Sequence, residues 1–169
     1  KPQQFALVTL HRPSNVDRPD VLKKLVDTLQ ALANELQVVF PIHPRTRKNL
    51  EQLSLLKSLT DLPTLTLLEP LGYHEFMSLL CGTRLVLTDS GGLQEETTYL
   101  NIPCFTLREN TERPITITQG TNRLVNLTNV MPMIKKALKA PPTAKQAPQF
   151  WDGKTASRVV NSLVEYFKV

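Results

Sequence analysis

The stretch Arg84-Leu85-Val86-Leu87-Thr88-Asp89-Ser90-Gly91-Gly92 carries the clearest indication of the fold. Its apolar run at 84–88 predicts a buried strand, the two glycines predict a turn, and residues 93–100 predict a helix. A nearly continuous apolar strand is buried on both faces, as is typical of parallel sheets covered by helices. The stretch therefore predicts one strand–helix unit of a doubly wound, Rossmann-like α/β domain.

The same unit recurs along the chain, because short apolar runs alternate with amphipathic stretches. The helix expected at 17–36 carries apolar residues at helical spacing, whereas the stripe at 45–59 repeats every three residues and drifts around a helix. The expected strands are 5–10, 38–41, 65–68, 84–88, 103–107 and 123–125. The expected helices are 17–36, 45–59, 73–81, 93–100 and 155–167.

Length and composition predict one soluble globular domain over residues 1–169, with 41% hydrophobic and 21% charged residues. The proline-containing segment 141–145 is expected to be a linker to the last helix at 155–167. No apolar run reaches the roughly 18 residues of a membrane span, and residues 1–4 lack the apolar segment of a signal peptide. We therefore expect no membrane partner and a cytoplasmic location.

The net charge of +5 makes nucleic acid a partner to consider. The basic residues are scattered, with no run of five or more, and aromatic residues are not interleaved with them, so we expect no nucleic-acid binding. Cys81 and Cys104 have apolar neighbours, which indicates reduced thiols in the core. His11, His43 and His74 have no metal-ligand spacing, so no metal site is expected.

Polar residues collect where the expected strands end. In an open parallel sheet, ligands bind beyond the carboxyl ends of the strands. Loops at that edge would therefore line a single cleft, and the candidates are 9–12, 41–44, 69–71, 88–92 and 108–114.

The loop at 88–92 is the sharpest of these. Its two glycines let the backbone approach a ligand, and the helix that follows offers free N–H groups and the positive end of its dipole to an anion. Ser90 adds a hydroxyl donor, and Glu95 or Glu96 could accept from ribose hydroxyls. On these residues alone an alternative stays open, in which Asp89 or Ser90 only caps the helix and the glycines form a tight turn.

Two further loops at this edge of the expected sheet each contain a histidine. His11 and Arg12 follow the first strand as a pair that is cationic when His11 is protonated, and His43 lies in a loop stiffened by the prolines on either side. The alternatives are that both histidines are ordinary turn residues and that Asn15 and Asp17 only cap the next helix.

Arg113 precedes a proline at a position where a helix could begin, and an arginine there could bind a phosphate bidentately. The alternative is a surface ion pair with Glu109 or Glu112. Leu71 and Phe76 are, on sequence alone, ordinary packing residues.

In five motifs taken together and in order, the chain resembles the non-hydrolysing UDP-N-acetylglucosamine 2-epimerases along nearly its whole length. The motifs are Val8-Thr9-Leu10-His11-Arg12, Pro41-Ile42-His43-Pro44, residues 88–96 (Thr-Asp-Ser-Gly-Gly-Leu-Gln-Glu-Glu), residues 108–114 (Arg-Glu-Asn-Thr-Glu-Arg-Pro) and residues 120–125 (Gly-Thr-Asn-Arg-Leu-Val). The resemblance implies a GT-B arrangement of two Rossmann-like halves, of which this chain is the C-terminal half, closed by a C-terminal helix.

The resemblance also implies the chemistry. The family inverts C2 of the sugar of UDP-GlcNAc to give UDP-ManNAc, by elimination and re-addition of UDP, without NAD, metal or other cofactor. By motif, the implied catalytic residues are His11 and Arg113, both at the phosphates. The implied substrate-binding residues are Ser90, Gly91 and Gly92 at the diphosphate, Glu96 at the ribose, Phe76 and Leu71 at the uracil, and Arg12 and His43 lining the cleft, where some members hold a second, activating UDP-sugar.

The chain departs from the family pattern at three positions. Pro13 stands where many members have a second arginine, and Ser14 stands where they have glutamate, which bears on the activating site. Ile115 replaces a glutamate next to the phosphate-binding loop.

The resemblance further implies partners: the N-terminal half of the same enzyme, which contributes carboxylates for proton transfer, and a second copy in a homodimer. Three other functions stay open at this point. They are one half of a GT-B glycosyltransferase, a hydrolysing epimerase, and a stand-alone module that binds nucleotide sugars.

Overall fold

The structure, a computed structural model, describes residues 4–140 and 147–167. Its centre is a parallel sheet with strand order β3-β2-β1-β4-β5-β6, built from six strands in the described part of the chain. The strands are β1 (Phe5–Thr9), β2 (Gln37–Pro41), β3 (Leu65–Leu68), β4 (Leu85–Thr88), β5 (Cys104–Leu107) and β6 (Asn122–Val125). All of the predicted strands are confirmed, with ends that differ by at most a residue.

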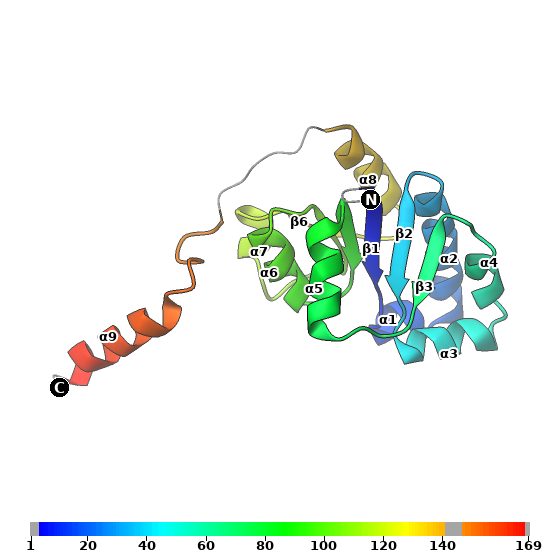
Figure 1. Cartoon of the computed structure of the whole chain (residues 1–169). Helices are drawn as coiled ribbons and strands as arrows, with labels where there is room; N and C mark the ends of the chain where they lie inside the picture. Colours follow the sequence, from blue (N-terminus) through cyan, green and yellow to red (C-terminus); the bar gives the residue numbers. More distant parts are fainter. Residues whose placement is uncertain (1–3, 141–146, 168–169) are drawn as a thin grey trace.

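The chain order reverses at the middle of the sheet. From β1 the chain adds β2 and β3 on one side, then returns to place β4 against the other side of β1 and continues to β5 and β6 (Figure 1). The loops after β1 and β4 therefore diverge at a topological switch point, where open α/β sheets bind ligands.

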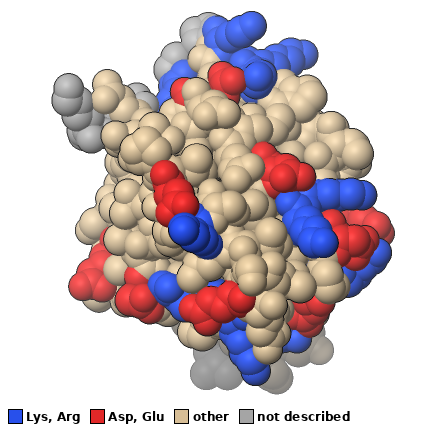
Figure 2. Space-filling view, turned by 90° about the vertical axis from the view of Figure 1, so that its right-hand side faces the viewer, with Lys and Arg blue, Asp and Glu red and all other residues tan. Residues whose placement is uncertain are grey.

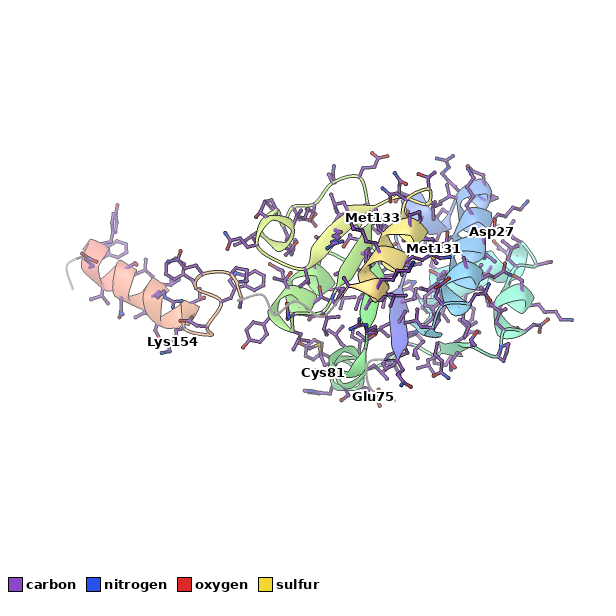
Figure 3. The ribbon with its side chains drawn as sticks, turned by 90° about the horizontal axis from the view of Figure 1, so that it is seen from above. Asp27, Glu75, Cys81, Met131, Met133 and Lys154 are labelled. Carbon is purple, nitrogen blue, oxygen red and sulfur yellow. The ribbon has the colours of Figure 1, made fainter. Side chains whose placement is uncertain are left out.

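Helices cover both faces of the sheet. They are α1 (Pro13–Val16), α2 (Pro19–Ala33), α3 (Pro44–Gln52), α4 (Leu56–Thr60), α5 (Tyr73–Gly82), α6 (Gly92–Tyr99), α7 (Ile115–Thr118), α8 (Val130–Lys139) and α9 (Thr155–Phe167). Seen from above, Met131 and Met133 of α8 lie on one side of the sheet, and Glu75 and Cys81 of α5 lie on the other (Figure 3).

The alternation of side chains along β1 explains why there are two cores. Ala6 and Val8 pack into a large cluster with α2 and α8, whereas Leu7 packs into a smaller one with α5 and α6. All three side chains are completely buried. A strand that is apolar on both faces needs such a two-sided cover, so the predicted doubly wound α/β fold is confirmed.

Some predicted helix boundaries were wrong. The segment 45–59 forms two helices, because Ser54 takes a left-handed φ of 56° between α3 and α4. The helix expected at 17–36 runs only from Pro19 to Ala33, after the separate short helix α1.

Helix α8 escaped prediction, whereas α7 begins directly after Pro114, where the sequence allows a helix to begin. In α8, Val130 and Ile134 are buried at helical spacing, but Pro132 interrupts the apolar pattern in the sequence. A proline in the first turn of a helix costs no hydrogen bond, so the helix forms despite it.

Both cysteines are free thiols, yet Cys81 is exposed, so the prediction of a core position was wrong for it. Cys104 is buried, and burial raises the pKa of its thiol to about 11.

The C-terminal helix α9 has the predicted bounds, Thr155–Phe167, and none of its described residues is buried. Its large apolar side chains are exposed, among them Val160, Leu163 and Val164. The predicted linker at 141–145 lies outside the described residues. None of the described helices is both long and apolar enough to cross a membrane.

One face of the molecule carries charges of both signs. Figure 2 shows acidic and basic side chains interspersed on the side of the sheet where α2, α3 and α4 lie. Several are paired there, as in the ion pairs of Arg18 with Asp20 and of Arg47 with Glu69. This face therefore lacks the broad basic surface that nucleic acid requires.

Candidate functional site

The site is organised around Asp89, directly after β4. Its side chain has no exposed surface, and its carboxylate accepts from the backbone amides of His11 and Arg12 at 2.9–3.1 Å and from Asn15 Nδ2 at 3.0 Å. An ionised carboxylate only accepts hydrogen bonds, which suits this set of donors. Asp89 thus fixes the loop after β1 and cannot itself touch a ligand, although we expected it at the core of the ligand site.

Further hydrogen bonds join the loops after β1 and β4 close to Asp89. The Thr9 and Thr88 hydroxyls lie 2.7 Å apart across β1 and β4, and Thr88 Oγ1 also accepts from the Ser90 amide at 2.9 Å. Arg12 Nε donates to the Asp89 carbonyl at 2.8 Å, so the Arg12 head group is held along the loop after β4. The loops after β1 and β4 are therefore joined by side-chain and backbone hydrogen bonds.

The alternative that Asn15 and Asp17 cap the next helix was wrong. The residue at the N-cap of α2 is Arg18, and no side chain caps that helix end among the described residues. Asn15 instead joins Asp89 to the Leu107 carbonyl, and Asp17 forms an ion pair with Arg45. Asn15 therefore ties three loops of the carboxyl edge together.

The predicted histidines come together at this edge. The rings of His11 and His43 lie 5.7 Å apart between centroids. His11 Nδ1 is 3.1 Å from Asp89 Oδ1, and His43 Nδ1 accepts from the Arg45 amide at 3.1 Å. The alternative of an ordinary turn residue is partly correct for His43, which is exposed and caps α3 through the Arg45 amide. His11 keeps 42% of its side chain exposed, and its ring contacts the Asp89 side chain.

The amino end of α6 is open to an anion. The N-cap residue is Gly91, and no side chain caps this end within the described residues, so the alternative of an Asp89 or Ser90 cap was wrong. A Cβ added at Gly91 would lie 3.2 Å from Glu112 Oε1, whereas one at Gly92 would meet nothing within 4 Å. The backbone at Gly91 is close to the neighbouring loop, and Gly92 faces open space, where the first amides of the helix can bind an oxyanion.

Arg113 reaches this helix end from the loop after β5. Its Nε donates to Glu95 Oε2 at 2.7 Å, and its Nη1 lies 3.4 Å from Glu112 Oε1. The pKa of Arg113 is raised, chiefly by the hydrogen bond with Glu95. Arg108 binds Glu112 at 2.8 Å and lowers the pKa of that carboxyl to about 2. The ion-pair alternative for Arg113 is thus partly correct, but its nearest partner is Glu95.

A buried network of side-chain amides and hydroxyls holds the loop after β5, which carries Arg113. Gln94 is completely buried; its Nε2 donates to the Ser90 carbonyl at 3.1 Å, and its Oε1 accepts from Thr111 Oγ1 at 2.6 Å and Asn122 Nδ2 at 2.9 Å. Asn122 Oδ1 in turn accepts from Thr106 Oγ1 at 2.6 Å. The network joins the loops after β4 and β5 through β6.

Thr111 connects this hydrogen-bond network to Arg113. Its Oγ1 accepts from the Arg113 amide at 3.0 Å, and Thr116 Oγ1 donates to the Arg113 carbonyl at 2.7 Å. We did not single out Gln94 or Asn122 from the sequence. For Gln94 the signal available was a polar residue at a position that the predicted helix buries, whereas Asn122 precedes the predicted strand at 123–125 and had no such signal.

The remaining candidates lie at the same edge, with fewer fixed contacts. Leu71 is half-buried just before α5, and Phe76 is half-buried on α5, where it packs against the smaller core cluster. Glu96 is half-buried on α6, next to Glu95. The structure brings together His11, Arg12, His43, Ser90, Gly91, Gly92 and Arg113 through the contacts above; Leu71, Phe76 and Glu96 are placed near them by their elements alone.

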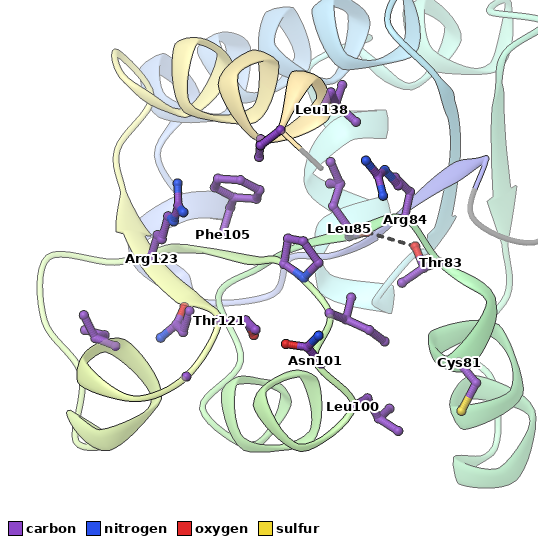
Figure 4. A pocket seen from close by; sticks show the side chains of 17 residues that line it. Cys81, Thr83, Arg84, Leu85, Leu100, Asn101, Phe105, Thr121, Arg123 and Leu138 are labelled. Atoms are coloured by element: carbon purple, nitrogen blue, oxygen red, sulfur yellow. Dashed lines mark hydrogen bonds between the residues drawn. The ribbon is translucent and has the colours of Figure 1, made fainter. Parts of the chain in front are cut away.

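A cavity of about 470 Å³ lies elsewhere, at the amino ends of β4, β5 and β6 (Figure 4). Phe105 and Leu138 form part of its apolar wall, and Arg84 and Arg123 add charge (Figure 4). It is at the opposite edge of the sheet from the polar loops. Among the described residues, no group of three or more His, Cys, Asp or Glu side chains could hold a metal ion.

Fold and site together define a class: a Rossmann-like α/β domain with an uncapped helix end at its switch point, an arrangement that suits an anion. The chain belongs to the UDP-N-acetylglucosamine 2-epimerase family, whose model matches residues 1–164.

Two relatives illustrate the similarity. The UDP-N-acetylglucosamine 2-epimerase of Methanococcus maripaludis is 40% identical over 165 residues, covering 95% of this chain and 44% of that protein. The crystal structure of Methanocaldococcus jannaschii UDP-GlcNAc 2-epimerase in complex with UDP-GlcNAc and UDP matches with a TM-score of 0.84 and 38% identity, over 97% of this chain and 46% of that one. The chain thus spans about half the length of the relatives it matches.

A more distant structure shares the fold alone. It is an E. coli heptosyltransferase with ADP, at 17% identity and a TM-score of 0.56, matched over 80% of this chain and 45% of that one. The expected likeness to one Rossmann-like half of a GT-B fold is confirmed.

Proposed function

We propose that this chain is the UDP-binding half of a UDP-N-acetylglucosamine 2-epimerase, which interconverts UDP-GlcNAc and UDP-ManNAc by elimination and re-addition of UDP. The observation that carries the proposal is the uncapped amino end of α6, with Arg113 bound to Glu95 in the first turn of that helix and His11 next to Asp89, which directly precedes the loop into it. Elimination of UDP needs strong stabilisation of the leaving diphosphate, and helix amides with a nearby guanidinium supply it.

Each candidate then has a role. The backbone at Ser90, Gly91 and Gly92 binds the diphosphate, and Arg113 exchanges its Glu95 partner for a phosphate oxygen. Glu96 binds the ribose, Leu71 and Phe76 contact the uracil, and His11 contacts the phosphates and assists proton transfer. Arg12 and His43 line the cleft between them.

The rest of the chemistry belongs to the other half of the enzyme. The relatives are about twice as long as this chain, which supports an N-terminal half whose carboxylates move protons at C2. The uncovered apolar face of α9 supports a contact with that half. We also propose that the whole enzyme is a homodimer in the cytoplasm that serves polysaccharide biosynthesis; the free thiols of Cys81 and Cys104 are compatible with a reducing compartment.

Calorimetric titration of the 169-residue chain with UDP tests the binding role. We expect weak, millimolar binding that Arg113→Ala weakens about tenfold, the usual value of one charge-assisted hydrogen bond at a partly exposed site. Arg123→Ala, an exposed arginine at the opposite edge, is the matched control and should leave binding unchanged. The absence of heat at millimolar UDP would refute the proposal.

Product analysis tests the reaction. The chain alone should not turn over UDP-GlcNAc, and the enzyme with both halves should yield UDP-ManNAc. Release of UDP with free N-acetylmannosamine would instead indicate a hydrolysing epimerase, and sugar transferred to an acceptor would indicate a GT-B glycosyltransferase. Binding of UDP-sugar without any turnover by the whole protein would indicate a binding module.

A further inference from the structure

The two cleft histidines differ in what holds their rings. We infer that His11 and His43 are fixed in opposite tautomers and that Asp89 is the positioning residue that sets the tautomer of His11. This inference rests on the proposed function only for its chemical use; the tautomers themselves follow from contacts within the chain.

His43 carries its proton on Nε2. Its Nδ1 accepts a hydrogen bond from the Arg45 amide at 3.1 Å, as the first residue before α3. A ring nitrogen that accepts has a lone pair, so in the neutral ring the proton is on the other nitrogen. His43 is exposed, and Nε2 lies on the side of the ring away from the backbone contact, so His43 can offer an N–H donor to a ligand at this edge of the sheet.

His11 carries its proton on Nδ1. That nitrogen lies 3.1 Å from Asp89 Oδ1, an oxygen of a completely buried carboxylate. The same carboxylate accepts from the amides of His11 and Arg12 and from Asn15, and this set of N–H donors suits the ionised form, which has no proton to donate to Nδ1. A proton on Nδ1 lies close to this negative oxygen and is attracted to it, whereas an unprotonated, electron-rich Nδ1 would be repelled at 3.1 Å. The proton therefore stays on Nδ1, and Nε2 presents a lone pair on the exposed side of the ring.

The difference separates two chemical roles within one cleft. His11 Nε2 can take a proton from an O–H group, leaving the bonding electrons on that oxygen, and can return the proton later while Nδ1–H keeps its contact with Asp89. If His43 took up a proton, it would do so on Nδ1 and break its bond with the Arg45 amide. With the rings 5.7 Å apart, one ligand can meet both: His43 donates to it, and His11 carries its proton.

Nitrogen-15 NMR on histidine-labelled chain measures the tautomers directly, because protonated and unprotonated ring nitrogens have different chemical shifts. At a pH where the rings are neutral, we expect a protonated Nδ1 in His11 and a protonated Nε2 in His43, with exposed His74 on α5 as an internal reference. The same tautomer in both rings would overturn the inference. The wild-type spectrum decides this without any variant.

Two variants test the cause. Asp89→Asn removes the negative oxygen beside Nδ1, and we expect His11 alone to become a mixture of tautomers. Arg45→Ala keeps the amide that binds His43 but removes the ion pair with Asp17, so both tautomers should stay as they are. An unchanged His11 in a folded Asp89→Asn protein would refute the role of Asp89.

Kinetics on the enzyme with both halves separate positioning from folding. Asp89→Asn should lower kcat about 100-fold, as expected for impaired proton transfer, with a far smaller change in KM for UDP-GlcNAc. A change in KM with kcat unaltered would overturn the positioning role. If UDP does not bind but the tautomers are opposite, the proposed function fails and the tautomer assignment stands. If UDP binds but the tautomers are identical, the tautomer assignment fails and the proposed function stands.

Discussion

Two corners of the same sheet edge are held in different ways. At the corner between β1 and β4, a fully buried carboxylate, Asp89, accepts several N–H groups. In the loop after β5, Arg108, Glu112 and Arg113 form ion pairs that are partly exposed, above a neutral buried network. Exposed ion pairs contribute little to stability, so they can be exchanged for a ligand at small cost, whereas the first corner must remain intact.

The largest loss of stability should come from removing the buried Asp89 carboxylate between β1 and β4. Asp89→Ala leaves the amides of His11 and Arg12 and the Asn15 side chain without their acceptor, and it should reduce the free energy of unfolding by about 3–5 kcal/mol. Asp27→Ala, at an exposed position on α2, is the control and should change it by less than about 0.5 kcal/mol. Urea denaturation measures both. Equal losses in the two variants would remove the distinction between the corners.

The second-largest loss of stability should come from the neutral hydrogen-bond network beneath the loop after β5. Gln94→Leu leaves the Thr111 hydroxyl and the Asn122 amide without their shared acceptor, at a cost of about 2–3 kcal/mol in unfolding free energy. Gln119→Leu, an exposed glutamine at the end of α7, is the matched substitution and should be nearly neutral. A Gln94→Leu protein as stable as wild type would mean that the ion pairs alone hold the loop.

Two glycines sharpen the contrast between an enclosed and an open backbone. A Cβ at Gly120 would lie 2.4 Å from the Thr116 carbonyl and from Thr98 Oγ1, so Gly120→Ala should cost about 1–3 kcal/mol. A Cβ at Gly92 would meet nothing within 4 Å, and Gly92→Ala should leave stability unchanged or raise it by up to about 1 kcal/mol through helix propensity. Thermal unfolding of the pair tests this, and the opposite ranking would contradict it.

The smallest expected effect is on the stability of the fold at low pH. The hydrogen bond from Arg108 lowers the pKa of Glu112 from 4.5 to about 2. Because the pKa is lower in the folded state, the stabilisation is present above pH 4.5 and is lost as the pH falls from there toward 2. Glu112→Gln should remove this part of the acid dependence, while Glu109→Gln, at an exposed neighbour, should not. A carboxyl chemical-shift titration of Glu112 with a midpoint near 4.5 would contradict the assignment.

The strands were predictable from the sequence because a buried parallel strand is a short, uninterrupted apolar run. Val86 and Leu87 show this, since both are completely buried. The errors have local causes. A left-handed residue, Ser54, divides one predicted helix, and a proline in the first turn conceals α8.

The candidate site could be predicted as a set of loops but not as a set of contacts. Strand order and the loop after each strand put His11, Ser90 and Arg113 at one edge. The contacts of Asp89 join residues 74–78 positions apart, and no local pattern indicates that a carboxylate next to Ser90 would be buried and bind the loop after β1. The pairing of Arg113 with Glu95 is likewise set by how two helices and a loop meet.

The position of β1 has a consequence for how the chain folds. β1 is the first strand along the sequence, yet it pairs with β4, and Thr9 meets Thr88, which is 79 positions further along the chain. Closing so long a loop is entropically costly and slows folding. A chain that has assembled only β1, β2 and β3 has no Asp89 beneath His11. The candidate site and its histidine contact are therefore expected to form late, in the same step that joins the two halves of the sheet.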